Sequence, residues 1–231
     1  MRAEVRATML DMTLIIALSA AFVLGVEHAF EPDHVVAVST IVAQSRGLVK
    51  SIVTGSLWGL GHTVALLIAG IIVILLRVQF PTGISTVFET IVGFMLVILG
   101  IWAIINVRKN RLHFHVHAHD GKTHVHLHSH RETESHDHKH LPFSVGVVHG
   151  LAGSGALVIL VMSTMVDIRQ GLFFIIAFGG GSILAMSMIS SALSLPLTFG
   201  GKLSTWLGTL FSTGAGILSL ILGILVVFRF F

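Results

Sequence analysis

The stretch His28-Ala29-Phe30-Glu31-Pro32-Asp33-His34 places two histidines and two carboxylates inside an apolar run that covers residues 12–43. Ionisable side chains at membrane depth are expensive, so they mark an ion pathway or a binding site. Imidazole and carboxylate are also ligands that divalent transition metals accept. The stretch therefore predicts a metal-ion site inside a membrane, with four candidate ligands: His28, Glu31, Asp33 and His34.

The composition indicates an integral membrane protein. Of 231 residues, 54% are hydrophobic and 11% charged, and the mean hydropathy is +0.92. A soluble domain carries about 25% charged residues. Since no ten-residue segments of alternating polarity recur, we expect membrane-spanning helices and not a barrel.

Three further features of the composition narrow the function. The chain contains no cysteine, so any metal must be held by histidine, carboxylate or backbone oxygen. The basic pI of about 9.8 reflects Lys and Arg at helix ends and does not indicate nucleic-acid binding. Arg2 and Arg6 precede an apolar run as in a signal peptide, but the run continues into the His/Asp stretch, so we expect no cleavage.

Six segments have the apolar length of about 20 residues that a spanning helix needs. They cover roughly 12–44, 50–76, 84–107, 142–165, 170–195 and 204–228. The first is too long for one straight span. Pro32 lacks a backbone donor and disfavours helix at Glu31, so we expect the first helix to break there.

The distribution of Lys and Arg predicts the orientation. With six spans, nine of these residues fall on the side of the loop 108–141 and five fall on the other side. The positive-inside tendency then places this loop in the cytoplasm and both termini outside, in the cytoplasmic membrane.

The two halves of the chain resemble each other. The segment 25–30 matches 146–151, 58–65 matches 178–185, and 97–101 matches 220–224, at offsets of 121, 120 and 123 in the same order. With three spans per repeat, the halves would be inverted in the membrane, as in many secondary transporters. We therefore expect repeats over 1–107 and 142–231 around the loop 108–141. The alignment leaves residues 9–20 as an N-terminal extension.

Two histidines in other spans extend the candidate site. His62 lies mid-span between glycines that allow close helix approach, and His149 aligns with His28 in the repeat. Each alone is as readily explained as a hydrogen-bonded polar group between helices. Glu27 and Glu31 could instead relay protons or line a gate of the ion pathway. Five serines of the later spans most simply serve helix packing, and the alternative is a role in the ion pathway. They are Ser182, Ser187, Ser190, Ser191 and Ser194.

The loop is rich in histidine, with an alternating pattern on both sides of Asp120-Gly121. Alternation is typical of strands, and Asp-Gly is a turn signal. A hairpin folded there would pair residue 119 with 124, 117 with 126, 115 with 128 and 113 with 130, and form a chelating face. The alternative is a disordered tract that chelates without a fold. The eight residues concerned are His113, His115, His117, His119, His124, His126, His128 and His130.

The spacing His28-x4-Asp33-His34 resembles the signature of the nickel/cobalt transporter family, and Gly61-His62-Thr63 resembles that family's motif in the next span. Glu27, Glu31-Pro32 and the missing acidic motif of the later spans depart from the family pattern. The segment 149–155 is similar to the urease-accessory branch of nickel permeases. The resemblance implies metal-ion transport with His28, Asp33, His34 and His62 as site residues.

These observations predict an all-α membrane protein of six helices that transports Ni²⁺ or Co²⁺, with Zn²⁺ also compatible, and is not an enzyme. The metal is its substrate, and no cofactor is expected. Uptake is favoured over efflux, with delivery to a metallochaperone or to nickel-enzyme assembly proteins. Two other classes stay open: a membrane metalloenzyme, against which the absence of an HExxH helix counts, and a metal sensor or storage protein.

Overall fold

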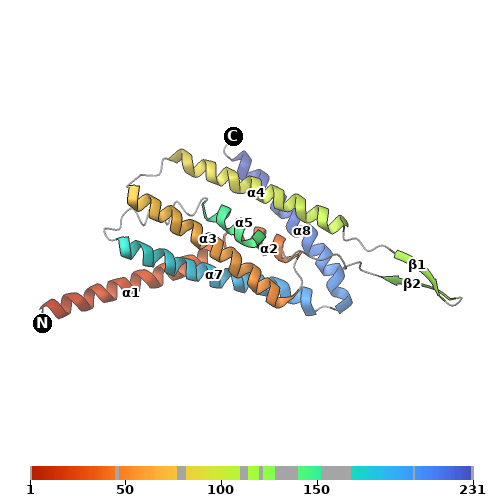
Figure 1. Cartoon of the computed structure of the whole chain (residues 1–231), viewed down its shortest axis with the longest axis horizontal. Coiled ribbons are helices and arrows are strands. Elements are labelled where there is room, and N and C mark those ends of the chain that lie inside the picture. Colours follow the sequence, from red (N-terminus) through yellow and green to blue (C-terminus); the bar gives the residue numbers. More distant parts are fainter. Residues whose placement is uncertain are drawn as a thin grey trace.

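The structure is a computed structural model, and it describes residues 2–44, 47–76, 82–109, 114–119, 122–127, 140–151, 168–199 and 201–229. Within these ranges the chain forms seven helices and one two-stranded hairpin (Figure 1). In order, the elements are α1 (Arg2–His28), α2 (Pro32–Val42), α3 (Leu48–Leu76), α4 (Thr82–Lys109), β1 (Phe114–His119), β2 (Lys122–Leu127), α5 (His140–Gly150), α7 (Ile168–Phe199) and α8 (Gly201–Phe228).

Several of these helices are long and apolar enough to cross a membrane. Four meet this condition alone, over Leu48–Ile72, Thr86–Val107, Arg169–Thr198 and Leu207–Phe228. A fifth span is possible if α1 and α2 are counted as one bent pair. The fourth segment expected from the sequence, 142–165, is described only in its first part as α5, because residues 152–167 lie outside the described ranges. These helices support a multi-pass membrane protein.

The predicted break of the first helix is confirmed. Helix α1 ends at His28, α2 begins at Pro32, and the two are bent by 60°. Glu31 leaves the helical region, with φ −58° and ψ 142°, as expected for a residue before proline. Pro32 then occupies the first turn of α2, where its missing N–H has no partner to lose.

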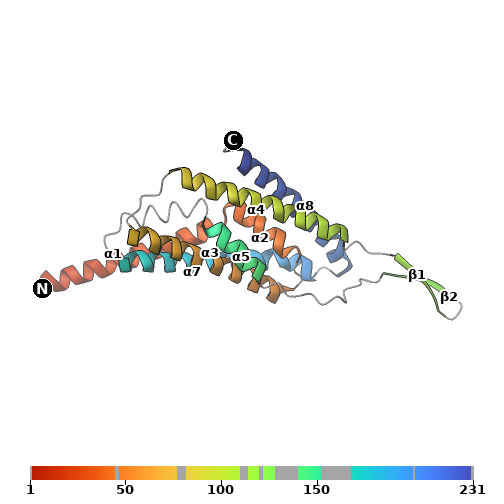
Figure 2. The same cartoon turned by 45° about the horizontal axis from the view of Figure 1, so that its top comes forward.

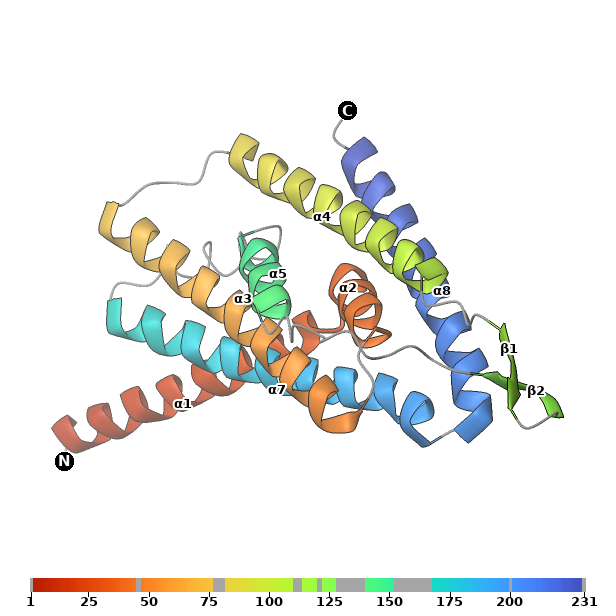
Figure 3. The ribbon, with the colours of Figure 1, turned by 45° about the vertical axis from the view of Figure 1, so that its right-hand side comes forward.

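The two halves of the chain interlock. Helix α1 packs on α7, α3 packs on both α7 and α5, and α4 packs on α8. Figures 1 and 3 show the short helices α2 and α5 between the α4–α8 pair and the layer formed by α1, α3 and α7. The first turns of α1 extend beyond this body (Figure 2).

Glycines allow the helices to approach closely, and their contacts recur between the halves. A Cβ added at Gly25 would overlap the carbonyl oxygen of Phe178, and one added at Gly146 would overlap that of Trp58. These two contacts are equivalent at offsets of 121 and 120. Three more pairs of glycine contacts are equivalent between the halves in the same way. Gly61 packs against Phe143, as Gly181 packs against Phe22. Gly59 packs against Ile183, as Gly179 packs against Thr63, and Gly100 packs against Leu220, as Gly223 packs against Val97.

Hydroxyl groups supplement this packing. Ser182 donates a hydrogen bond to the carbonyl of Gly25 at 3.1 Å, and the hydroxyls of Ser56 and Ser187 lie 2.9 Å apart across the α3–α7 contact. Ser191 and Ser194 hydrogen-bond to carbonyls of their own helix. These bonds fit the expected packing role of the serines.

The hairpin exists, but the predicted register was wrong. The strands pair His117 with His124 and His115 with His126, and they end on the pair His119 and Lys122. The strands are thus joined by two residues, Asp120 and Gly121, which is the commonest hairpin connection. A pairing of residue 119 with 124 would instead leave four residues between the strands. His113, His128 and His130 lie outside the described residues.

Candidate metal centre

The break between α1 and α2 places two histidines from the first stretch side by side. His28 is the last residue of α1, and His34 lies in the first turn of α2. The centroids of their rings are 4.3 Å apart. On a continuous helix these side chains would point away from each other, because six residues correspond to well over one turn and a half. The change of direction at Glu31 and Pro32 is therefore what makes the cluster.

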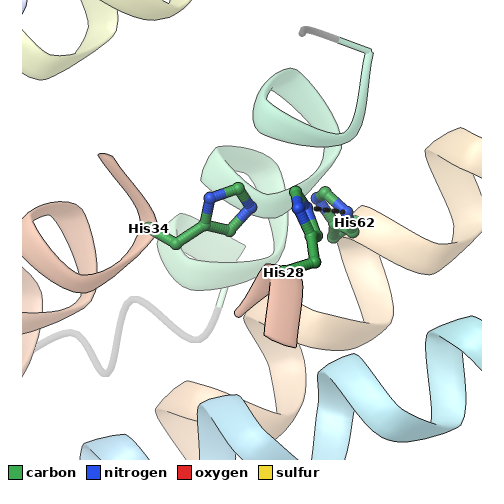
Figure 4. A group of neighbouring side chains, drawn as sticks. All are labelled: His28, His34 and His62. Carbon is green, nitrogen blue, oxygen red and sulfur yellow. Dashed lines mark hydrogen bonds between the residues drawn. The ribbon is translucent and has the colours of Figure 1, made fainter. Parts of the chain in front are cut away.

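His62 and His149 join this pair from two other helices. His62 comes from the middle of α3, with its Nε2 atom 3.2 Å from Nε2 of His28. His149, near the end of α5, lies with its ring centroid 3.9 Å from that of His34. All four imidazoles are at most 5% exposed. Figure 4 shows the rings of His28, His34 and His62 converging, with one ring nitrogen of His34 directed at the other two.

Potential metal ligands form two overlapping groups of three within the described residues. One group is His28, His34 and His62. The other is Asp33, His34 and His149. In each group the ligand atoms lie within 4.8 Å of one another, and His34 belongs to both.

Two carboxylates orient the rings. The Oε1 atom of Glu31 lies 2.9 Å from Nδ1 of His28, and Oδ1 of Asp33 lies 3.1 Å from Nδ1 of His34. An ionised carboxylate only accepts, so each imidazole donates its Nδ1–H. The Nε2 atoms then carry the lone pairs, and second-shell carboxylates of this kind are typical of metal-binding histidines.

Three ring nitrogens of the cluster have no hydrogen-bond partner among the described residues. They are Nε2 of His34, Nδ1 of His62 and Nδ1 of His149, and all are buried. A buried polar atom without a partner is costly and needs an explanation such as a bound ion. The donor set of imidazole nitrogens plus carboxylate oxygen fits Ni²⁺, Co²⁺ or Zn²⁺.

The structure thus brings together His28, Asp33, His34, His62 and His149. It separates Asp33 from His28, although a single centre for both was expected, because Asp33 turns toward His149, with Oδ2 and Nε2 2.9 Å apart. Glu31 belongs to neither group and contacts the outer nitrogen of His28. A direct ligand role for Glu31 therefore has no support in this geometry.

Two aromatic residues, which the sequence did not indicate as part of the site, pack against the histidine cluster. The ring of Trp58 lies 5.8 Å from that of His149, and the ring of Phe178 lies 5.4 Å from that of His28. The internal repeat already aligned Trp58 with Phe178 and His149 with His28. The two contacts are therefore equivalent under this alignment, although the alignment alone predicts neither of them.

Comparison with known proteins places the chain. It is 38% identical over 192 residues to urease accessory protein UreH of Bacillus sp. (strain TB-90), a match that covers 83% of this chain and 82% of that protein. The chain belongs to the UreH family. This result agrees with the resemblance of segment 149–155 to the urease-accessory branch.

A second relative is more distant. The chain is 26% identical over 206 residues to the chloroplast protein FOR GROWTH AND FERTILITY 1 of Arabidopsis thaliana. The match covers 85% of this chain but 56% of that protein. No protein-family model and no solved structure matches the chain.

Proposed function

We propose that this UreH-family protein is a permease that carries a divalent transition-metal ion, Ni²⁺ or Co²⁺, across the cytoplasmic membrane. The carried ion binds in the buried cluster formed by His28, Asp33, His34, His62 and His149. The metal is the substrate, and the protein is not an enzyme.

The observation that carries this proposal is the convergence of four buried imidazoles and one carboxylate at a broken helix. Burying so many ionisable groups in apolar surroundings is costly. A bound cation offsets part of the cost by accepting the lone pair of the buried Nε2 atom of His34, which has no hydrogen-bond partner among the described residues. Broken helices that surround a central ion site are typical of secondary transporters.

The paired glycine contacts support a transport mechanism based on two inverted three-helix repeats. Four pairs of glycine contacts are equivalent between the halves, so rocking one repeat against the other would exchange similar packings at these points. Such rocking would open the site to each side of the membrane in turn. No nucleotide-binding motif occurs, so an ion gradient or a partner would supply the energy.

The relative named as a urease accessory protein favours uptake, with delivery of nickel to enzyme-assembly proteins in the cytoplasm. The histidine-rich loop would then receive the ion after passage. In an efflux permease, the same loop would collect the ion before export.

Radiotracer flux in proteoliposomes tests the proposal. We expect ⁶³Ni²⁺ to accumulate in vesicles that contain the full chain. Flux should persist when the eleven histidines between 113 and 140 are replaced by glutamine, and His62→Gln should abolish it. Sidedness follows from protease protection of the loop, which separates uptake from efflux. No flux in either orientation, with metal binding intact, would contradict the proposal.

A further inference from the structure

The buried cluster is built as two ligand groups that share one imidazole. The ring nitrogens of His28 and His62 lie 3.2 Å apart on one side of His34. On the other side of His34, the Oδ1 atom of Asp33 lies 3.1 Å from Nδ1 of His34, and the Oδ2 atom of Asp33 lies 2.9 Å from Nε2 of His149. Metal–nitrogen bonds of about 2.0–2.1 Å let one ion bridge atoms at such separations.

We propose that the centre offers one ion two alternative positions, an all-imidazole position (His28, His34 and His62) and a carboxylate position (Asp33, His34 and His149). This inference rests on the proposed function, and it replaces one composite site by two positions that exchange around His34.

His34 makes the two positions mutually exclusive. A neutral imidazole has one N–H and one lone pair. In the all-imidazole position His34 binds through Nε2, and its Nδ1–H donates to Asp33. In the carboxylate position His34 binds through Nδ1 and carries its proton on Nε2. The ring cannot serve both positions at once, and two divalent ions so close together would repel strongly in a medium of low dielectric constant.

The two positions differ in accessibility and in chemistry. The three histidines of the all-imidazole position are buried, whereas the side chain of Asp33 is 30% exposed. Imidazole suits borderline metals such as Ni²⁺, and a carboxylate also suits harder ions. The carboxylate position is therefore the one that an ion meets first, and the all-imidazole position is the more selective one.

The repeat explains why the positions lie next to each other. His28 and His149 are equivalent in the two halves, and their rings flank His34 at 4.3 Å and 3.9 Å. The all-imidazole position thus contains His28 of the first half, and the carboxylate position contains its equivalent in the second half, His149. In the second half Ser182 stands where the first half has His62, so only one imidazole comes from that half.

Nickel X-ray absorption on the full chain tests the proposal. The background is the chain whose eleven histidines between 113 and 140 are replaced by glutamine, so that the four buried histidines are the only ones that remain. We expect one Ni²⁺ per chain. His149→Gln should keep one ion, bound by three imidazoles. His62→Gln should also keep one ion, bound by two imidazoles and a carboxylate. His34→Gln should weaken binding at least tenfold, since both positions lose a ligand.

Two results would overturn the proposal while leaving a buried transport site intact: two ions per chain, or loss of binding in both His62→Gln and His149→Gln, as one composite site requires. No Ni²⁺ in the background chain would instead contradict the proposed function itself. The comparison of His62→Gln with His149→Gln decides the question even if His34→Gln fails to fold.

Discussion

At the scale of single residues, the centre depends on the carboxylate of Glu31, which holds the imidazole of His28 in one tautomer. Glu31 contacts Nδ1 of His28, and this contact directs Nε2 toward His62. Glu31 is 46% exposed, so its part is to orient the ring and not to stabilise the fold. Second-shell partners of this kind contribute about 10–100-fold to metal affinity.

We therefore predict that Glu31→Gln lowers Ni²⁺ affinity by about tenfold or more, with little change in melting temperature. Isothermal titration of the chain with glutamine at the loop histidines measures this. The matched control is Glu27→Gln, a neighbouring exposed carboxylate outside both ligand groups. Equal affinities in the two variants would show that Glu31 does not orient His28.

The sequence named the residues that the structure brings together, but it did not predict their grouping. Ionisable side chains in an apolar run single out His28, Asp33 and His34, and the resemblance to the transporter family adds His62. That Asp33 joins His149 and not His28 depends on the direction in which α2 leaves the break, and Pro32 predicts a break without predicting its angle. The sequence indicated His149 as a candidate ligand only through its alignment with His28.

At the scale of helices, glycines decide how closely the elements approach. Gly181 faces the backbone of Phe22 in the α1–α7 contact, and an added methyl group would overlap the carbonyl oxygen there. A backbone neighbour cannot rotate away as a side chain can. The two helices must therefore separate to accommodate even alanine.

We predict that Gly181→Ala destabilises the protein by about 1–3 kcal/mol, the usual cost of overpacking. Its neighbour supplies the control, because a Cβ at Gly180 meets no atom within 4 Å. Gly180→Ala should be neutral or slightly stabilising, since alanine favours helix over glycine. Thermal unfolding in detergent measures both. Similar melting temperatures for the two variants would contradict the close α1–α7 contact.

Helix existence was predictable from apolar length, and strand register was not. The four candidate spans in the described residues, and the bent pair of α1 and α2, agree with segments read from hydropathy. In the hairpin, alternation constrains which residues share a face but leaves the connection length open. Histidines pair with histidines along most of the hairpin in two registers. In one register residue 119 pairs with residue 124, and in the other it pairs with residue 122.

At the scale of the whole molecule, uptake as proposed has the loop 108–141 on the cytoplasmic side of the membrane and both termini on the other side. The chain has no cysteine, so single cysteines can report orientation without background. We predict that Ser129→Cys in intact cells reacts with an impermeant maleimide only after permeabilisation. Ala3→Cys should react before it. The reverse pattern would invert the assigned topology and favour the opposite direction of transport.

Within the described residues, several packing contacts recur in the two halves, but the candidate ligands do not. Equivalent glycine contacts relate the two halves, whereas four of the five cluster residues come from the first half. The paired glycine contacts thus occur in both halves, whereas the candidate site depends on the broken first helix. The segment matches in the sequence agree with the paired contacts but did not predict which helices they join.

The central claim is that a metal ion binds among His28, Asp33, His34, His62 and His149. Anomalous scattering at the nickel edge, from crystals of the full chain soaked in Ni²⁺, tests it most directly. We predict a peak in contact with His34 in addition to any peak at the loop. Peaks confined to the loop histidines, with none near His34 at saturating Ni²⁺, would contradict the claim.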